Sequence, residues 1–190
     1  MNFIVSSSEL LEKLQMINGV VGTNSVLPIL EDFLFQIEDG KLTVFATDLE
    51  TSMSTDVEVE GKENGKVAIP AKIMVETLRN LPDQPVTFLV DDKTYGVEIT
   101  TANGVFKVAG ENGEEYPRIP EQQDASSLQL SSDVLQRAIG KTLFAVSNDE
   151  LRPAMTGVYF KLDETGITFV ARPLPRPLTD PNQTATRSRV

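Results

Sequence analysis

The chain has 190 residues, which is enough for one domain and part of a second. It holds 28 acidic and 17 basic residues, a balance that argues against a protein that coats nucleic acid through a generally positive surface, so any such contact should be local. Cysteine and histidine are both absent. This excludes disulfide frameworks, thiolate and imidazole zinc sites and nucleophiles activated by histidine, and leaves carboxylates, Lys, Tyr or a bound cation for any catalysis.

The N-terminal segment predicts no targeting sequence. Residues 1–20 contain a polar serine run where a signal peptide would have a basic segment and a long apolar stretch. No apolar run approaches the roughly 20 residues that a membrane span requires. We therefore expect a soluble, cytoplasmic protein without membrane contact.

The first 60 residues predict a strand, a helix and three further strands. Residues 3–5 form the first strand, and the serines that follow it are preferred helix N-caps. The helix spans residues 6–18, because leucines recur there at helical spacing. Alternating apolar residues then predict strands, joined first by an acidic-Gly-Lys hairpin turn, around residues 33–37, 42–46 and 56–60.

The next segment repeats this order. A strand at 67–69 leads into a helix at 70–80, where Pro70 occupies the first turn that tolerates proline. Three strands follow, at residues 86–90, 97–100 and 105–108. Residues 1–120 should thus form an α+β domain built from two strand-helix-three-strand halves.

A second copy of this pattern begins after a polar segment. Residues 111–124 contain two prolines and suit an interdomain linker. Beyond them the sequence matches the first copy at an offset close to 125, so that Phe35 corresponds to Phe160. The match predicts that residues 125–171 form the first half of a second domain, although any two strand-helix-strand segments share part of such a pattern.

The repeat breaks at residue 172. Residues 172–190 carry four prolines, four arginines and little apolar material, which predicts that they cannot form the strand that follows in the first copy. Our hypothesis is that this tail is not native to the fold, as a frameshift or a truncation would produce. Ordered pairing of the tail with the sheet of the second domain would contradict it.

Several segments together resemble the bacterial DNA polymerase III sliding clamp, the beta subunit. They are, in chain order, Met1-Asn2-Phe3, Leu27-Pro28-Ile29-Leu30, Ala46-Thr47-Asp48-Leu49-Glu50, Ile69-Pro70-Ala71-Lys72 and Glu115-Tyr116-Pro117. The resemblance implies the DNA-clamp fold and a non-catalytic, cofactor-free processivity factor for DNA replication. It also implies a homodimeric head-to-tail ring with three domains in each chain, helices lining the DNA side and antiparallel sheets outside. This chain would be the N-terminal part.

The distribution of charge agrees with that layout. The three helix segments hold five basic and four acidic residues, whereas the rest of the chain before the tail holds eight basic and 23 acidic residues. Each of the pairs Lys72 with Arg79 and Arg137 with Lys141 projects from one helical face. These four are candidate DNA-binding residues, unless they are ordinary solvated charges. The resemblance adds Asn24, where the family often has a basic residue, and Arg152, which is followed by Pro153-Ala154 in place of a more aromatic pair.

The resemblance also implies protein partners, namely the polymerase III catalytic subunit and the clamp loader. Met155 matches one position of the pocket that binds their peptides, but the next family segment and the third domain are missing. We therefore expect no tight peptide binding. The edge of the first domain that would meet another chain includes Ile73, Thr77, Phe106 and Val108. Because the third domain is missing, ring closure should fail as well.

Two other functions stay open from the sequence. Asp48-Leu49-Glu50-Thr51 matches the motif of metal-dependent 3'-5' exonucleases, in which Asp48 and Glu50 would hold cations. The structural alternative is that Asp48 ends a strand and accepts hydrogen bonds from turn amides. A general protein-interaction scaffold without a role on DNA would also fit the composition.

Overall fold

The computed structural model describes residues 1–22, 27–61, 63–117, 129–147, 149, 151–163, 166–172 and 186–189. The chain divides into two compact units, Met1–Glu121 and Gln122–Val190, which we call the first and second units. Each is considered by itself. No helix in the described ranges has the length and apolar character needed to cross a membrane.

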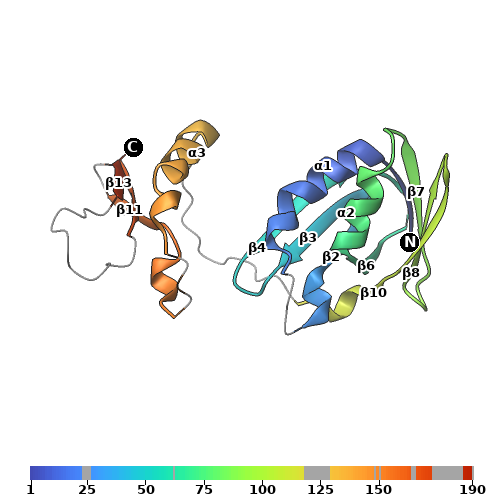
Figure 1. Ribbon diagram of the computed structural model, residues 1–190. Coiled ribbons are helices and arrows are strands. Elements are labelled where there is room, and N and C mark those ends of the chain that lie inside the picture. The colour runs from blue at the N-terminus through green and yellow to red at the C-terminus, as the bar shows by residue number, and fades with distance from the viewer. Residues whose placement is uncertain are drawn as a thin grey trace. The chain divides into compact units, whose positions relative to one another are not determined.

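The first unit consists of two halves with the same order of elements (Figure 1). The first half contains β1 (Asn2–Ser6), α1 (Ser7–Ile17), β2 (Asp32–Glu38), β3 (Lys41–Thr47) and β4 (Ser52–Glu58), followed by the short β5 (Glu60–Gly61). The second contains β6 (Gly65–Pro70), α2 (Ala71–Arg79), β7 (Pro85–Val90), β8 (Gly96–Thr101) and β9 (Gly104–Ala109), followed by the short β10 (Glu111–Asn112). These elements confirm the predicted α+β fold of strand-helix-three-strand halves. Strand β4 starts four residues earlier than predicted, because it pairs along the whole of β3. The start of the predicted linker at 111–124 also differs, because it forms β10 and a 3-10 helix, Gly113–Glu115, of the first unit.

The two halves exchange their first strands. In the described residues the strand order is β5-β1-β7-β8-β9 in one sheet and β10-β6-β2-β3-β4 in the other. Strand β1 of the first half therefore pairs antiparallel with β7 of the second, and β6 of the second half pairs with β2 of the first. Neither half can complete its own sheet without the other.

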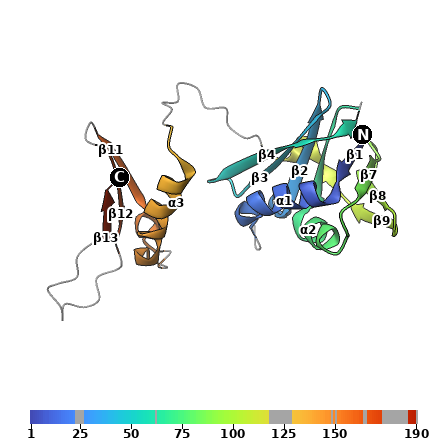
Figure 2. The same ribbon diagram turned by 90° about the horizontal axis from the view of Figure 1, so that it is seen from above.

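The core lies between the two sheets and the two helices. Helices α1 and α2 lie side by side and pack on the strands (Figure 2). Phe88 of β7 stacks on Phe3 of β1 at a centroid distance of 4.8 Å and lies 6.3 Å from Phe35 of β2. All three side chains are fully buried, and such aromatic contacts add to the free energy gained by burial. The halves are thus joined by apolar packing as well as by strand pairing.

Local sequence sets the ends of these elements. The Ser6 hydroxyl caps α1 by accepting a hydrogen bond from the Glu9 amide at 3.4 Å. Asp39 and Gly40 join β2 to β3 with φ angles of 51° and 80°, the left-handed conformation that a two-residue hairpin of this type requires. Both features agree with the predicted N-cap and turn.

The second unit repeats the first half at the predicted offset. It contains α3 (Ser132–Gly140), β11 (Tyr159–Asp163) and β12 (Gly166–Ala171). Ser131 caps α3 as Ser6 caps α1, accepting from the Val134 amide at 3.4 Å. Phe160 pairs with Phe169 as Phe35 pairs with Val44. The same sequence pattern therefore produces the same local structure twice.

The end of the chain corrects one prediction. Thr186–Arg189 forms β13, which pairs antiparallel with β12 in the order β11-β12-β13. The prediction that the tail cannot form a strand of this sheet was wrong, because its prolines all precede residue 182 and leave a proline-free end whose backbone amides can donate to the ladder. This pairing is also the outcome that the hypothesis of a non-native tail excluded.

Candidate nucleic-acid interface

The exposed face of α2 carries two of the predicted DNA-binding residues. Lys72 lies in the first turn and Arg79 in the last, while the opposite face of the helix is buried in the core. Glu76 lies on the same exposed face, but neither cation forms an ion pair with it or with any other described residue. Both charges are therefore available to an external anion.

Lysines on the strands behave differently. Within the described ranges Lys41, Lys66, Lys107 and Lys161 each contact a carboxylate, at distances from 2.6 to 3.5 Å. The shortest contact joins Lys41 to Asp56, and the hydrogen bond from Lys41 is the main reason why the pKa of Asp56 is lowered. The strand lysines are thus neutralised locally, whereas the cations of α2 are not.

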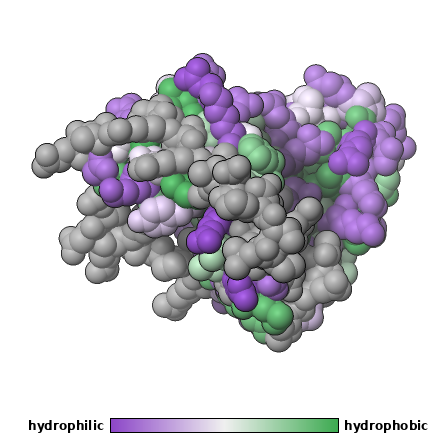
Figure 3. Space-filling view, turned by 60° about the vertical axis from the view of Figure 1, so that its left-hand side comes forward, coloured by the Kyte–Doolittle hydropathy of each residue, from purple (hydrophilic) through white to green (hydrophobic). Residues whose placement is uncertain are grey.

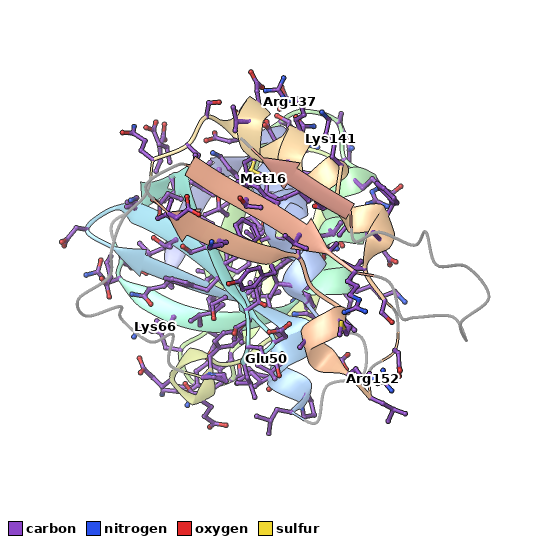
Figure 4. All side chains as sticks on the ribbon, turned by 90° about the vertical axis from the view of Figure 1, so that its left-hand side faces the viewer. Met16, Glu50, Lys66, Arg137, Lys141 and Arg152 are labelled. Carbon is purple, nitrogen blue, oxygen red and sulfur yellow. The ribbon has the colours of Figure 1, made fainter. Side chains whose placement is uncertain are left out.

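The second unit presents its predicted cations in two places. Arg137 lies in the last turn of α3 and Lys141 is the C-cap residue, and both side chains are exposed and unpaired in the described part of the chain. Figure 4 shows these two at one end of the second unit and Arg152 at the opposite end. Arg152 therefore does not extend the patch formed by Arg137 and Lys141. Asn24 lies outside the described residues.

Formal charge divides unequally between the two units. Residues 1–121 contain 21 acidic and nine basic residues, whereas residues 122–190 contain seven acidic and eight basic residues. The excess of negative charge therefore resides entirely in the first unit. An attraction to phosphate in that unit depends on where its cations are placed, because its net charge is repulsive.

The residues predicted at the outer edge of the first unit are not equally accessible. Strand β9 is an edge strand of its sheet. Phe106 of β9 and Ile73 of α2 are exposed, and Thr77 is half-buried. Val108 faces the core and is buried, so it contributes no exposed surface to this edge.

Met155, the predicted peptide-pocket residue, lies in a short 3-10 helix, Pro153–Met155. Its carbonyl accepts a hydrogen bond from the Ser147 amide at 2.9 Å, and its side chain is half-buried. This helix repeats the one at Pro28–Glu31 in the first unit. The role of Met155 in binding peptides stays a prediction.

Asp48 has the structural role that the sequence offered as an alternative to metal binding. One carboxylate oxygen accepts hydrogen bonds from the backbone amides of Glu50, at 3.0 Å, and Thr51, at 2.6 Å. Leu49 between them has a φ of 77°. The motif thus forms the tight turn from β3 to β4, and no group of three or more potential metal ligands occurs in the described ranges.

A buried carboxyl group that the sequence did not reveal lies at the start of β2. Asp32 is 6% exposed, and its Oδ2 atom has no hydrogen-bond partner in the described residues. Burial, followed by the charges of Glu111 and Glu31, raises its pKa to about 7. Tyr116 covers this side of the sheet, and its hydroxyl donates to the Asp32 carbonyl at 3.3 Å. Burial also raises the pKa of Tyr116 to about 12.

Comparisons with known proteins agree on one family. A family profile described as "DNA polymerase III beta subunit, N-terminal domain" matches residues 1–120. A protein of Vibrio cholerae named beta sliding clamp is 31% identical over 173 residues, and one of Haemophilus influenzae is 32% identical over 172. Each alignment covers 90% of this chain and 47% of the relative.

Solved structures agree with these relatives. A crystal structure described as a DNA polymerase III beta subunit, from Eubacterium rectale, superposes with a TM-score of 0.86 at 28% identity. The superposition covers 92% of this chain and 47% of that one. The chain therefore spans about half the length of the proteins that it matches.

Proposed function

The chain belongs to the DNA polymerase III beta subunit family, and on that premise we propose that it supplies the N-terminal part of a sliding clamp. The complete clamp encircles duplex DNA as a head-to-tail ring and tethers a replicative polymerase without catalysing a reaction itself. Its DNA side is formed by α1, α2 and α3, and its outer surface by the sheets. A role in bacterial replication implies a cytoplasmic location.

The unpaired cations of the helices carry this proposal. Three of these cations, Lys72, Arg79 and Arg137, lie on helices, and Lys141 is the C-cap residue of α3. None of the four has an acidic partner in the described ranges, whereas the strand lysines are paired. Unpaired, exposed cations can attract phosphates without fixed contacts, which allows a ring to slide. An acidic remainder discourages binding of DNA elsewhere on the surface.

Salt-dependent binding to a short duplex tests the role of these cations. We expect the double variant Lys72→Ala/Arg79→Ala to bind more weakly and to lose up to about 0.9 in the slope of log K against log salt for each phosphate contact removed. The matched control is Lys41→Ala/Lys107→Ala, which removes two paired lysines from strands. If both double variants changed binding equally, general charge and not the helix face would be responsible.

Topological retention distinguishes a clamp from a protein-interaction scaffold. A version extended to the full length of the relatives should remain on nicked circular DNA and slide off after linearisation. The 190-residue chain should show no such difference, because Ile73, Thr77 and Phe106 mark an edge that would meet a further domain of the complete clamp. Retention of the extended version that did not depend on DNA topology would contradict the clamp proposal.

The polymerase catalytic subunit and the clamp loader are the proposed protein partners of the complete clamp. Met155 would line the pocket for their peptides together with a domain that this sequence does not contain. We therefore expect the 190-residue chain to bind such peptides no more tightly than about 10 μM. Sub-micromolar binding in a calorimetric titration would contradict this expectation.

A further inference from the structure

Several asparagines of the first unit are followed directly by glycine. They are Asn18, Asn64, Asn103 and Asn112. In such a pair the glycine amide nitrogen can approach the asparagine carboxamide carbon with little hindrance, because glycine has no side chain. Figure 3 shows hydrophilic residues over much of the described surface, and three of these asparagines are exposed, so exposure alone does not distinguish them. Their hydrogen bonds and backbone conformations do.

Hydrogen bonds hold two of these carboxamides in place. The Asn112 Oδ1 atom accepts from the Glu114 amide at 3.1 Å, and its Nδ2 atom donates to the Glu115 carboxylate at 3.4 Å. The Asn64 Oδ1 atom accepts from the Asp39 amide at 3.1 Å. Rotation of either carboxamide carbon toward the next amide nitrogen would break these bonds, so both sites are protected.

Helical backbone protects Asn18. This residue is the C-cap of α1, with φ of −61° and ψ of −23°, and its amide donates to the Leu14 carbonyl. Its own carbonyl accepts from the Val21 amide at 3.2 Å. A five-membered ring between the side chain and the next nitrogen fixes ψ outside the helical range. Reaction at Asn18 therefore requires the end of the helix to open.

Asn103 lies at the exposed tip of the β8–β9 hairpin. The Thr101 hydroxyl accepts from the Asn103 backbone amide at 3.1 Å and donates to the Gly104 carbonyl at 3.0 Å. These bonds engage the backbone, and the Asn103 carboxamide has no hydrogen-bond partner among the described residues. A Cβ atom added to Gly104 would meet nothing within 4 Å, so its surroundings are open. Strand β9 is an edge strand, and the exposed tip of an edge hairpin opens at low cost.

We propose that Asn103 is the site at which the folded protein is deamidated. The Gly104 amide nitrogen forms a bond to the Asn103 Cγ atom, the Cγ–Nδ2 bond breaks, and the amide proton leaves with the amino group as ammonia. Water then opens the resulting cyclic imide at either carbonyl and gives aspartate or isoaspartate. The net reaction is hydrolysis of an amide, so water is the one co-reactant.

Both products change the edge of the sheet. Each adds a negative charge, and isoaspartate also places its Cβ atom in the main chain of a two-residue turn. Thr101 and Gly104 pair directly across this turn, and their register has no room for an extra main-chain atom. We therefore expect isoaspartate to loosen β9. Because the exposed Phe106 lies on this strand, contact of the clamp edge with another domain would weaken, and that last step alone rests on the proposed function.

Peptide mapping by mass spectrometry, after incubation of the 190-residue chain at mildly alkaline pH, tests the site. Asn103 should react at least about tenfold faster than Asn112, whose carboxamide must first lose two hydrogen bonds. In concentrated urea the Asn-Gly pairs should react at similar rates, because the fold no longer separates them. Faster reaction of Asn18, Asn64 or Asn112 in the folded chain, or an equal preference for Asn103 with and without urea, would overturn the proposal.

Two variants and amide exchange complete the test. Asn103→Gln should abolish most of the release of ammonia, because a glutamine side chain must close a larger, six-membered ring. Asn64→Gln removes another Asn-Gly pair and should leave the release nearly unchanged. Amides of β9 should exchange faster in the aged parent chain and not in aged Asn103→Gln, and equal exchange in the two would contradict the loosening of the edge. These measurements involve no DNA, so their failure would leave the clamp proposal unaffected.

Discussion

The first half of the first unit and the second unit have the same fold and the same register but different degrees of burial. In both, a serine-capped helix precedes a hairpin with the same pairing of its two strands. Among the described residues, a second half covers that hairpin in the first unit, and the buried apolar cluster there is larger than the one in the second unit. A half-unit therefore determines its own secondary structure, whereas its hydrophobic stabilisation depends on a partner half.

Truncation of equivalent phenylalanines in the two units tests this difference in burial most directly. Phe35→Ala should lower the free energy of unfolding of the first unit by about 3–5 kcal/mol, because it leaves a cavity in a closed core. Phe160→Ala should cost about 1 kcal/mol or less, because half of that side chain is already exposed. Urea unfolding followed by circular dichroism measures both. Equal losses would mean that Phe160 is covered as well as Phe35.

The two units should also differ in how their stability depends on pH. Asp32 has a folded-state pKa of about 7 and an ordinary value of 3.8, so the stability that its neutral form contributes is present below about pH 4 and is lost as the pH rises through 7. Asp32→Asn should therefore stabilise the first unit by roughly 2–4 kcal/mol at pH 8 and have little effect at pH 4.

The corresponding position in the second unit is Gly157, so only unfolding of the first unit should show this dependence. Thermal unfolding of Asp32→Asn and the parent chain across the pH range provides the measurement. Exposed Glu31→Gln is a suitable control, because it removes a neighbouring charge and should reduce the dependence only slightly. A stabilisation of Asp32→Asn that did not change with pH would refute the assignment.

The helix caps allow a smaller comparison between equivalent positions. Ser131→Ala should destabilise the second unit by about 1 kcal/mol, because the Val134 amide loses its acceptor. Ser6→Ala should cost the first unit somewhat more, since the Ser6 hydroxyl also contacts Ser8 and Asp83. Denaturation midpoints of the two variants would show whether the extra contacts matter. Ser131→Gly and Ser6→Gly are the controls, because glycine is tolerated at the N-cap.

The smallest effect on stability is expected for the cations of α2. Lys72→Ala and Arg79→Ala should each change the free energy of unfolding by less than about 0.5 kcal/mol, because neither side chain has a partner to lose. An unchanged stability together with weaker DNA binding would show that these two residues bind DNA and do not support the fold. A large loss of stability would show that these residues support the fold.

Much of the site followed from residue patterns. Helical spacing predicted that Lys72 and Arg79 share one exposed face, and turn chemistry predicted the role of Asp48 as a hydrogen-bond acceptor. Pattern could not show which lysines are paired, because Lys66 meets Glu114 from a strand 48 residues away. Nor could it reveal Asp32, whose burial depends on Tyr116 folding back over β2.

The order of elements, the caps and turns and the 125-residue repeat could all be predicted from the sequence, because they depend on side-chain periodicity and local backbone preferences. The family could be predicted from the resemblance of several short segments. Three features could be learned only from the tertiary structure. The halves exchange their first strands, the end of the chain adds β13 to its sheet, and Phe160 is half exposed although Phe35 is fully buried. These features depend on contacts between segments far apart in the chain, whose free energy is set by which surfaces meet and not by the pattern of either surface alone.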